Sequence, residues 1–164
     1  MKEVEIIPVE IRWRLAARAL SSLPLAYNWA YRDRVGAAYP HLEKAIFSEA
    51  AKDALAVSMA YYAPVDEATD IARIFGVVSS VIFGPGFEGS ITTLPEMGAR
   101  VCVFGCPLLE VARDLGFELE RAYDACDAYT RAVMDFFNSS HCIIREKAMC
   151  HGDPRCEFAI LKNP

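Results

Sequence analysis

The chain has 164 residues, of which 54% are hydrophobic and 24% are charged, and its formal net charge is -5. This composition excludes a disordered chain, and the length fits a single domain, residues 1–164, with its own core. The negative charge and the lack of a Lys/Arg run exclude nucleic acid as a partner. The segment from Met1 to Val9 is charged, so neither a signal peptide nor a membrane-spanning segment is predicted, and we expect a cytoplasmic protein.

The spacing of apolar residues predicts a mostly helical first part, residues 1–86, and a mixed second part, residues 87–164. Pro24 is expected to kink or break the first helix, and Gly84-Pro85-Gly86 to end the third. The predicted elements are helices at 9–34, 42–62 and 66–83, strands at 90–93 and 99–104, helices at 107–115 and 118–137, and strands at 141–149 and 155–161. The second part thus reads strand-strand-helix-helix-strand-strand, which predicts an α+β fold with an antiparallel sheet packed on helices.

All six cysteines lie between Cys102 and Cys156. In a reducing compartment they are expected to be thiols, so metal, cofactor or catalytic roles come before disulfides. Cys106 precedes Pro107 at the start of a predicted helix, where free N–H groups and the helix dipole would favour a reactive thiolate. Alternatively, Cys106 is a small buried residue that fits the turn. Cys126 lies on an apolar helix stripe, which is typical of core packing.

The last predicted hairpin carries two cations on what should be one face of a strand. Alternation places Arg145 and Lys147 together, because residues two apart on a strand point the same way. If that face looks inward, the pair would bind a carboxylate or another anion, and if it looks outward, they are solvated surface charges.

Two cysteines, Cys150 and Cys156, flank the turn of this hairpin and could approach each other across it. With Cys126, Glu146 or His141 as further ligands, they would form a zinc site. The spacing is not one of the strong zinc signatures, and an iron–sulfur cluster is less favoured because it needs four close thiolates.

Together these motifs resemble a known family over the segment from Val101 to Phe158. The residues that carry the resemblance are Cys106-Pro107, Cys126, Asn138, Arg145-x-Lys147 and Gly152-Asp153-x-x-Cys156-Glu157-Phe158. Their order resembles the C-terminal pattern of the L-2-aminothiazoline-4-carboxylate hydrolases. The closing hairpin is also similar to that of vinyl-reductase-type (4-vinyl reductase) domains, which are ligand-binding modules.

The first resemblance implies an enzyme that hydrolyses a C–N bond in a small cyclic amidine-like carboxylate. It implies that Cys106 is the nucleophile or a polar anchor and that Asp153 orients the turn or transfers a proton. Arg145 and Lys147 would hold the substrate carboxylate.

The second resemblance implies the alternative, a non-enzymatic domain that binds a small organic ligand or zinc through its cysteines. Cys126 and Cys156 fall where two of the zinc ligands of such domains would be, whereas Glu146 and Cys150 are displaced by one or two positions from the other two. In both cases we expect a small-molecule ligand or substrate as partner, and a homodimer is kept open.

Overall fold

The structure, a computed structural model, describes residues 3–62, 65–95, 98–136 and 140–163, and its elements follow the predicted order. Three short 3-10 helices, η1 (Glu3–Ile6), η2 (Gly36–Ala38) and η4 (Met149–His151), accompany the longer elements. The longer elements are α1 (Val9–Val35), α2 (Tyr39–Tyr62), α3 (Ala68–Phe83), β1 (Glu88–Leu94), β2 (Gly98–Gly105), α4 (Pro107–Asp114), α5 (Leu119–Met134), β3 (His141–Lys147) and β4 (Cys156–Lys162).

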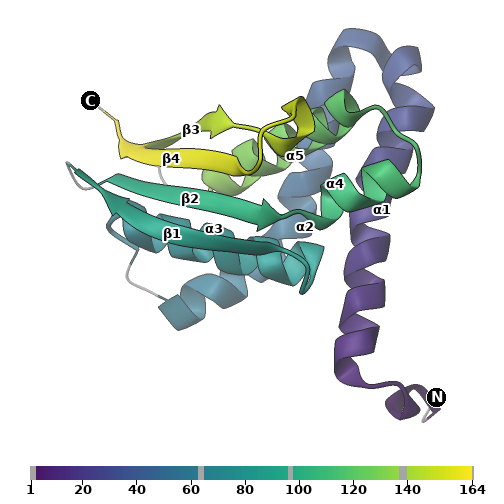
Figure 1. Cartoon of the computed structure of the whole chain (residues 1–164), viewed down its shortest axis with the longest axis horizontal. Helices are drawn as coiled ribbons and strands as arrows, with labels where there is room; N and C mark the ends of the chain where they lie inside the picture. The colour runs from purple at the N-terminus through teal and green to yellow at the C-terminus, as the bar shows by residue number, and fades with distance from the viewer. Residues whose placement is uncertain (1–2, 63–64, 96–97, 137–139, 164) are drawn as a thin grey trace.

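The first helix, α1, runs through Pro24 without a break, so the expectation that Pro24 breaks this helix is wrong. Pro24 is buried there, and the Ser21 hydroxyl donates to the Ala17 carbonyl in the preceding turn. In Figure 1, α1 stands at one side of the molecule, and its first half reaches beyond the sheet. None of the described helices is long and apolar enough to span a bilayer.

The third helix, α3, ends where the glycine at position 84 predicts. Gly84 has a φ of 86°, and its N–H bonds the Ser80 carbonyl. A Cβ added to Gly84 would lie 2.6 Å from the Ala17 Cβ, so α1 passes very close to this turn. Glycine therefore meets two requirements at once, the positive φ and the close approach of a helix.

The four strands form one antiparallel sheet in the order β1-β2-β4-β3. β4, the last strand of the chain, lies between β2 and β3, so the sheet joins the hairpin at 88–105 to the hairpin at 141–162. Figure 1 shows the strands side by side, with α3 behind β1 and β2 and α5 behind β3 and β4. The predicted α+β class is confirmed, with a helical first half and an antiparallel sheet packed on helices.

The core lies between the sheet and α3 and α5. Phe75 of α3 contacts Phe158 of β4, with ring centroids 5.8 Å apart, and Tyr129 of α5 contacts Phe83 at 4.8 Å. Residues that alternate along the strands divide between this core and the outer face of the sheet. Val101 and Val103 of β2 face the core, for example, whereas Cys102 between them faces outward.

Candidate functional site

Four of the cysteines, Cys106, Cys126, Cys150 and Cys156, gather at the end of the core near α4, α5 and the β3–β4 connection; we call them the thiol cluster. Their mutual electrostatic influence shows that they are neighbours. All are free thiols. The backbone N–H of Met149 donates to the Cys156 sulfur at 3.3 Å. Three regions of the sequence, around Cys106, Cys126 and the segment from Cys150 to Cys156, thus place their thiols together.

Three of these thiols border a small apolar cavity of about 20 Å³. That is room for about one water molecule, so the cavity holds no larger ligand in this conformation. The Tyr129 hydroxyl is bonded to Ser79 at 2.8 Å, which satisfies its polar atom. The lining consists of aromatic, aliphatic and thiol side chains: Phe75, Phe83, Phe87, Val103, Cys106, Leu108, Cys126, Tyr129, Cys156 and Phe158.

Two larger pockets adjoin the cavity through shared phenylalanines. Phe87, which is half-buried, also borders an apolar groove of about 390 Å³ between α1, α3, β1 and β2. Phe83 also borders an open pocket of about 330 Å³. The rings of Phe83 and Phe87 are 6.1 Å apart.

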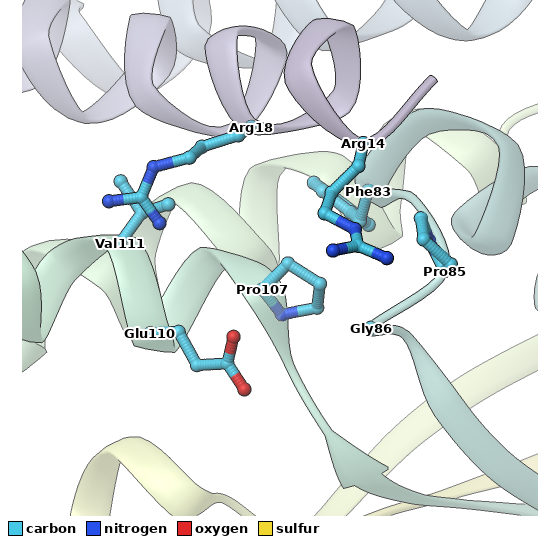
Figure 2. A pocket seen from close by; sticks show the side chains of 8 residues that line it. All are labelled: Arg14, Arg18, Phe83, Pro85, Gly86, Pro107, Glu110 and Val111. Atoms are coloured by element: carbon cyan, nitrogen blue, oxygen red, sulfur yellow. The ribbon is translucent and has the colours of Figure 1, made fainter. Parts of the chain in front are cut away.

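Figure 2 shows the open pocket between α1, α4 and the turn after α3. Arg14 and Arg18 extend into it from α1, and Glu110 extends from α4 on the other side. Arg18 is paired with Asp114 at 2.9 Å. Pro107, at the first position of α4, forms part of the wall. Pro107 therefore borders this open pocket, while the adjacent Cys106 borders the cavity at the thiol cluster.

A buried cation, Arg145, lies against the thiol cluster. Its side chain is 10% exposed, and its guanidinium lies 4.5 Å from the ring centroid of Tyr123 and 5.0 Å from that of Phe158. Its Nη2 donates to the Cys126 sulfur at 3.4 Å. Asp127, the acidic group it approaches, is 3.9 Å away. Arg145 therefore belongs to the site, although the sequence had left its orientation open.

The second predicted cation, Lys147, lies on the opposite face of the sheet. A β-bulge at Glu146 shifts the register, so Arg145 pairs with Phe158 but Lys147 pairs with Glu157. Lys147 donates to Glu157 at 2.7 Å on the outer face. The bulge adds one residue and reverses the alternation after it, so the structure does not bring the two cations together.

Burial sets the ionisation of the thiols. It is the main cause that raises the pKa of Cys106 to about 12, with Cys126 adding to it, while the Leu109 N–H acts in the opposite direction. Burial likewise raises the pKa of Cys150 to about 12, and it also raises the pKa of Cys156. These three thiols are neutral at pH 7. Cys106 occupies the predicted N-cap position before Pro107, but its pKa moves in the opposite direction to the expected one.

The charge on Arg145 is also affected by its surroundings. Burial is the largest influence and lowers the pKa of the guanidinium, but Cys126, Tyr123 and Asp127 together outweigh it and raise the pKa. Arg145 is therefore a cation inside a largely apolar site. Its Nε–H has no hydrogen-bond partner among the described residues.

The remaining predicted site residues have structural contacts. The Asp153 carboxylate accepts a hydrogen bond from the Ala148 N–H at 2.9 Å, which orients the β3–β4 turn. Glu146 pairs with Arg100 on the outer face of the sheet, at 3.1 Å. Among the described residues no group of three or more His, Cys, Asp or Glu side chains is arranged to hold a metal, which corrects the predicted metal binding. Asn138 lies outside the described residues.

Comparison with known proteins gives a fold but no family. No family model matches the sequence, and no curated protein matches it. Among solved structures, the chain is similar to trafficking protein particle complex subunit 3 from Naegleria fowleri, determined covalently bound to palmitic acid. The TM-score is 0.59 at 15% sequence identity, over 94% of this chain and 96% of that chain. The likeness establishes the fold.

This neighbour overturns the family predicted from the sequence. A subunit of a trafficking particle belongs to a different family from the aminothiazoline-carboxylate hydrolases and the vinyl-reductase-type domains. The predicted C–N hydrolase function, and its alternative of a vinyl-reductase-type domain that binds a ligand or zinc through cysteines, are corrected with it.

Sequence reasoning missed the aromatic residues that complete the site. Tyr123 lies three residues before Cys126 on α5, so helical spacing places both on one side of the helix. Tyr123 also stacks on His151, with ring centroids 4.2 Å apart. The spacing from Cys126 was a signal that could have identified Tyr123, whereas Phe87 joins the site only through the tertiary fold.

Proposed function

We propose that this chain is a cytoplasmic subunit of a protein assembly of the trafficking-particle type, and that it pairs with a second chain through α1. The observation that carries the proposal is the apolar outer side of α1, on a fold that matches a trafficking subunit over nearly its whole length. The six free cysteines support a reducing compartment.

The outer side of α1 has the spacing of a helix–helix interface. Apolar residues recur at intervals of four, three and four, as in the seam of a coiled coil, and a leucine one turn earlier extends the row. The row, which we call the α1 stripe, consists of Leu15, Ala19, Leu23, Ala26 and Ala30. Leu15 is 59% exposed and Leu23 is 48% exposed. A monomer gains nothing from such a row, whereas a partner helix would bury it.

A second copy of this chain is the partner that we propose for the α1 stripe. Two-fold homodimers are the commonest protein assemblies, and in them one surface binds its own copy. Small residues at Ala19 and Ala26 allow two helices to approach closely, and the leucines supply the buried area.

Sedimentation velocity of the wild type and of Leu23→Glu tests this interface. We expect a dimer for the wild type and a loss of about 2 kcal/mol or more for the variant, roughly thirtyfold in Kd. Tyr61→Glu is the control, because Tyr61 is 81% exposed at the far end of α2. A wild type that stays monomeric at the highest concentration reached, or a Leu23→Glu dimer as tight as the wild type, contradicts the proposal.

A second function is favoured by the cavity at the thiol cluster. We propose that the cavity and the adjoining groove hold one apolar acyl chain, as the similar trafficking subunit carries palmitic acid. Their shared wall is Phe87, and its rotation would join the two spaces. The walls are apolar, and burial raises the pKa of two bordering thiols, Cys106 and Cys156, so that they are neutral at pH 7; a hydrocarbon chain is the chemistry that fits.

Binding of 1-dodecanol, followed by isothermal titration calorimetry, tests the acyl-chain proposal. Val81 borders the groove and is 51% exposed, so Val81→Glu should weaken binding about tenfold or more without disturbing the fold. Ile144→Glu is the matched control, because Ile144 is 49% exposed on the sheet away from the groove. The proposal fails if the wild type does not bind 1-dodecanol or if both variants bind it equally well.

A further inference from the structure

We infer that Arg145 is the headgroup anchor of this site, and that the ligand is an aliphatic carboxylate whose ionised head binds the guanidinium while its tail enters the cavity. The inference rests on the acyl-chain proposal and adds to it the charged end of the ligand. Its basis is the position of a buried guanidinium with an unpaired N–H, which lies against Cys126 and Phe158, two residues of the wall of an apolar cavity.

The nearest carboxylate to Arg145 that the described residues offer is not within hydrogen-bond distance. Its side chain is nine-tenths buried, its Nη2 donates to the Cys126 sulfur, and it approaches Asp127 only to 3.9 Å. Asp127 is already paired with Arg131 at 2.7 Å. A buried charge is costly unless it is paired and hydrogen-bonded, so a native site of this kind needs an anionic partner.

The geometry of the guanidinium favours a carboxylate. Tyr123 and Phe158 approach the group within 5.0 Å of their ring centroids, which fixes its plane. The Nη2 group donates a hydrogen bond to the Cys126 sulfur, and the Nε–H is left to donate to a ligand oxygen. Arg binds carboxylates through parallel N–H donors, which a point-charge cation cannot do.

The position of Arg145 also sets the direction of the ligand. Two of its neighbours, Cys126 and Phe158, are themselves walls of the cavity. A head held at Arg145 therefore directs the tail past Tyr129 toward Phe83 and Phe87, where the cavity meets the larger pockets.

Paired titrations of dodecanoic acid and 1-dodecanol test the inference, because the two share a tail and differ in the head. At pH 8 the acid is ionised, and we expect the wild type to bind it roughly tenfold to a hundredfold more tightly than the alcohol. Arg145→Met should abolish this preference and leave the affinity for the alcohol unchanged, which also shows that the variant is folded. Arg145→Lys should keep a reduced preference.

Lys147→Met is the matched control, because Lys147 is two residues away on the opposite face of the sheet. It should keep the full preference for the acid. Equal binding of acid and alcohol by the wild type, or an unchanged preference in Arg145→Met, overturns the headgroup assignment while the acyl-chain proposal stands. If the wild type binds neither compound, the acyl-chain proposal itself has failed. An acyl thioester on Cys126 in the intact mass spectrum would replace the free carboxylate as the ligand and so overturn the inference.

Discussion

We expect Cys106 to react with iodoacetamide far more slowly in the native protein than after unfolding in urea. Burial raises the pKa of Cys106 from 9.0 to about 12, so at pH 7 the reactive thiolate is about a thousandfold scarcer than in the unfolded chain. The N-terminus of α4 acts in the opposite direction. A helix dipole contributes about 0.3–1 kcal/mol, which is less than a tenfold effect, so burial dominates.

Labelling at pH 7, followed by peptide mapping, measures this ratio directly. Cys150 should behave in the same way, since burial raises its pKa to about 12 as well. Cys142 is the internal reference, because it lies on the outer face of β3. If native Cys106 reacts within about tenfold of its rate in urea, or faster than Cys142, the reasoning from burial is refuted and the helix terminus controls this thiol.

Three further predictions concern stability, each measured by urea unfolding. Burial raises the pKa of Glu43, so the folded state favours the protonated carboxyl, and the free energy of unfolding falls as the pH rises above the usual pKa of 4.5. Glu43→Gln, which cannot ionise, should be about 1 kcal/mol more stable than the wild type at pH 7, and its stability should fall less with rising pH. Gly84→Ala should cost about 1–3 kcal/mol, because a Cβ there meets Ala17 at a positive φ; equal stability would contradict the close approach. Tyr129→Phe should cost about 1–2 kcal/mol, because Ser79 loses its partner, and a neutral effect would show that the hydroxyl pair adds nothing.

Local signals predicted the elements well. The apolar face of α3 and the glycine that ends it were readable from spacing, as was the start of α4 at Pro107. These features depend on residues close in the sequence. The pairing of β2 with β4 is different, because it joins residues 53 to 61 positions apart, from Val103 with Cys156 to Ala99 with Ile160, and depends on which faces the helices cover.

The site was less predictable from the sequence because two of its features depend on the tertiary structure. The bulge at Glu146 places Arg145 in the site and Lys147 outside it, and nothing in the alternation of residues announces an inserted position. Burial of Cys106 reversed the pKa that its N-cap position implied, since the depth of a thiol is a property of the whole fold.

The misleading family resemblance also has a physical reason. In the closing hairpin, the Asp153 carboxylate holds the Ala148 N–H, and Gly152 adopts a φ of 96°. Cys156 accepts the Met149 N–H in the same turn. A Gly-Asp-x-x-Cys motif thus stabilises the turn through backbone conformation and hydrogen bonds, so proteins of unrelated function can share it.

Native mass spectrometry of the purified protein tests the proposed assembly most directly. The α1 stripe predicts a species of twice the 18.2 kDa chain mass, which Leu23→Glu converts to the single chain and Tyr61→Glu does not. A wild type that appears only as the single chain under conditions that preserve known dimers would contradict the account.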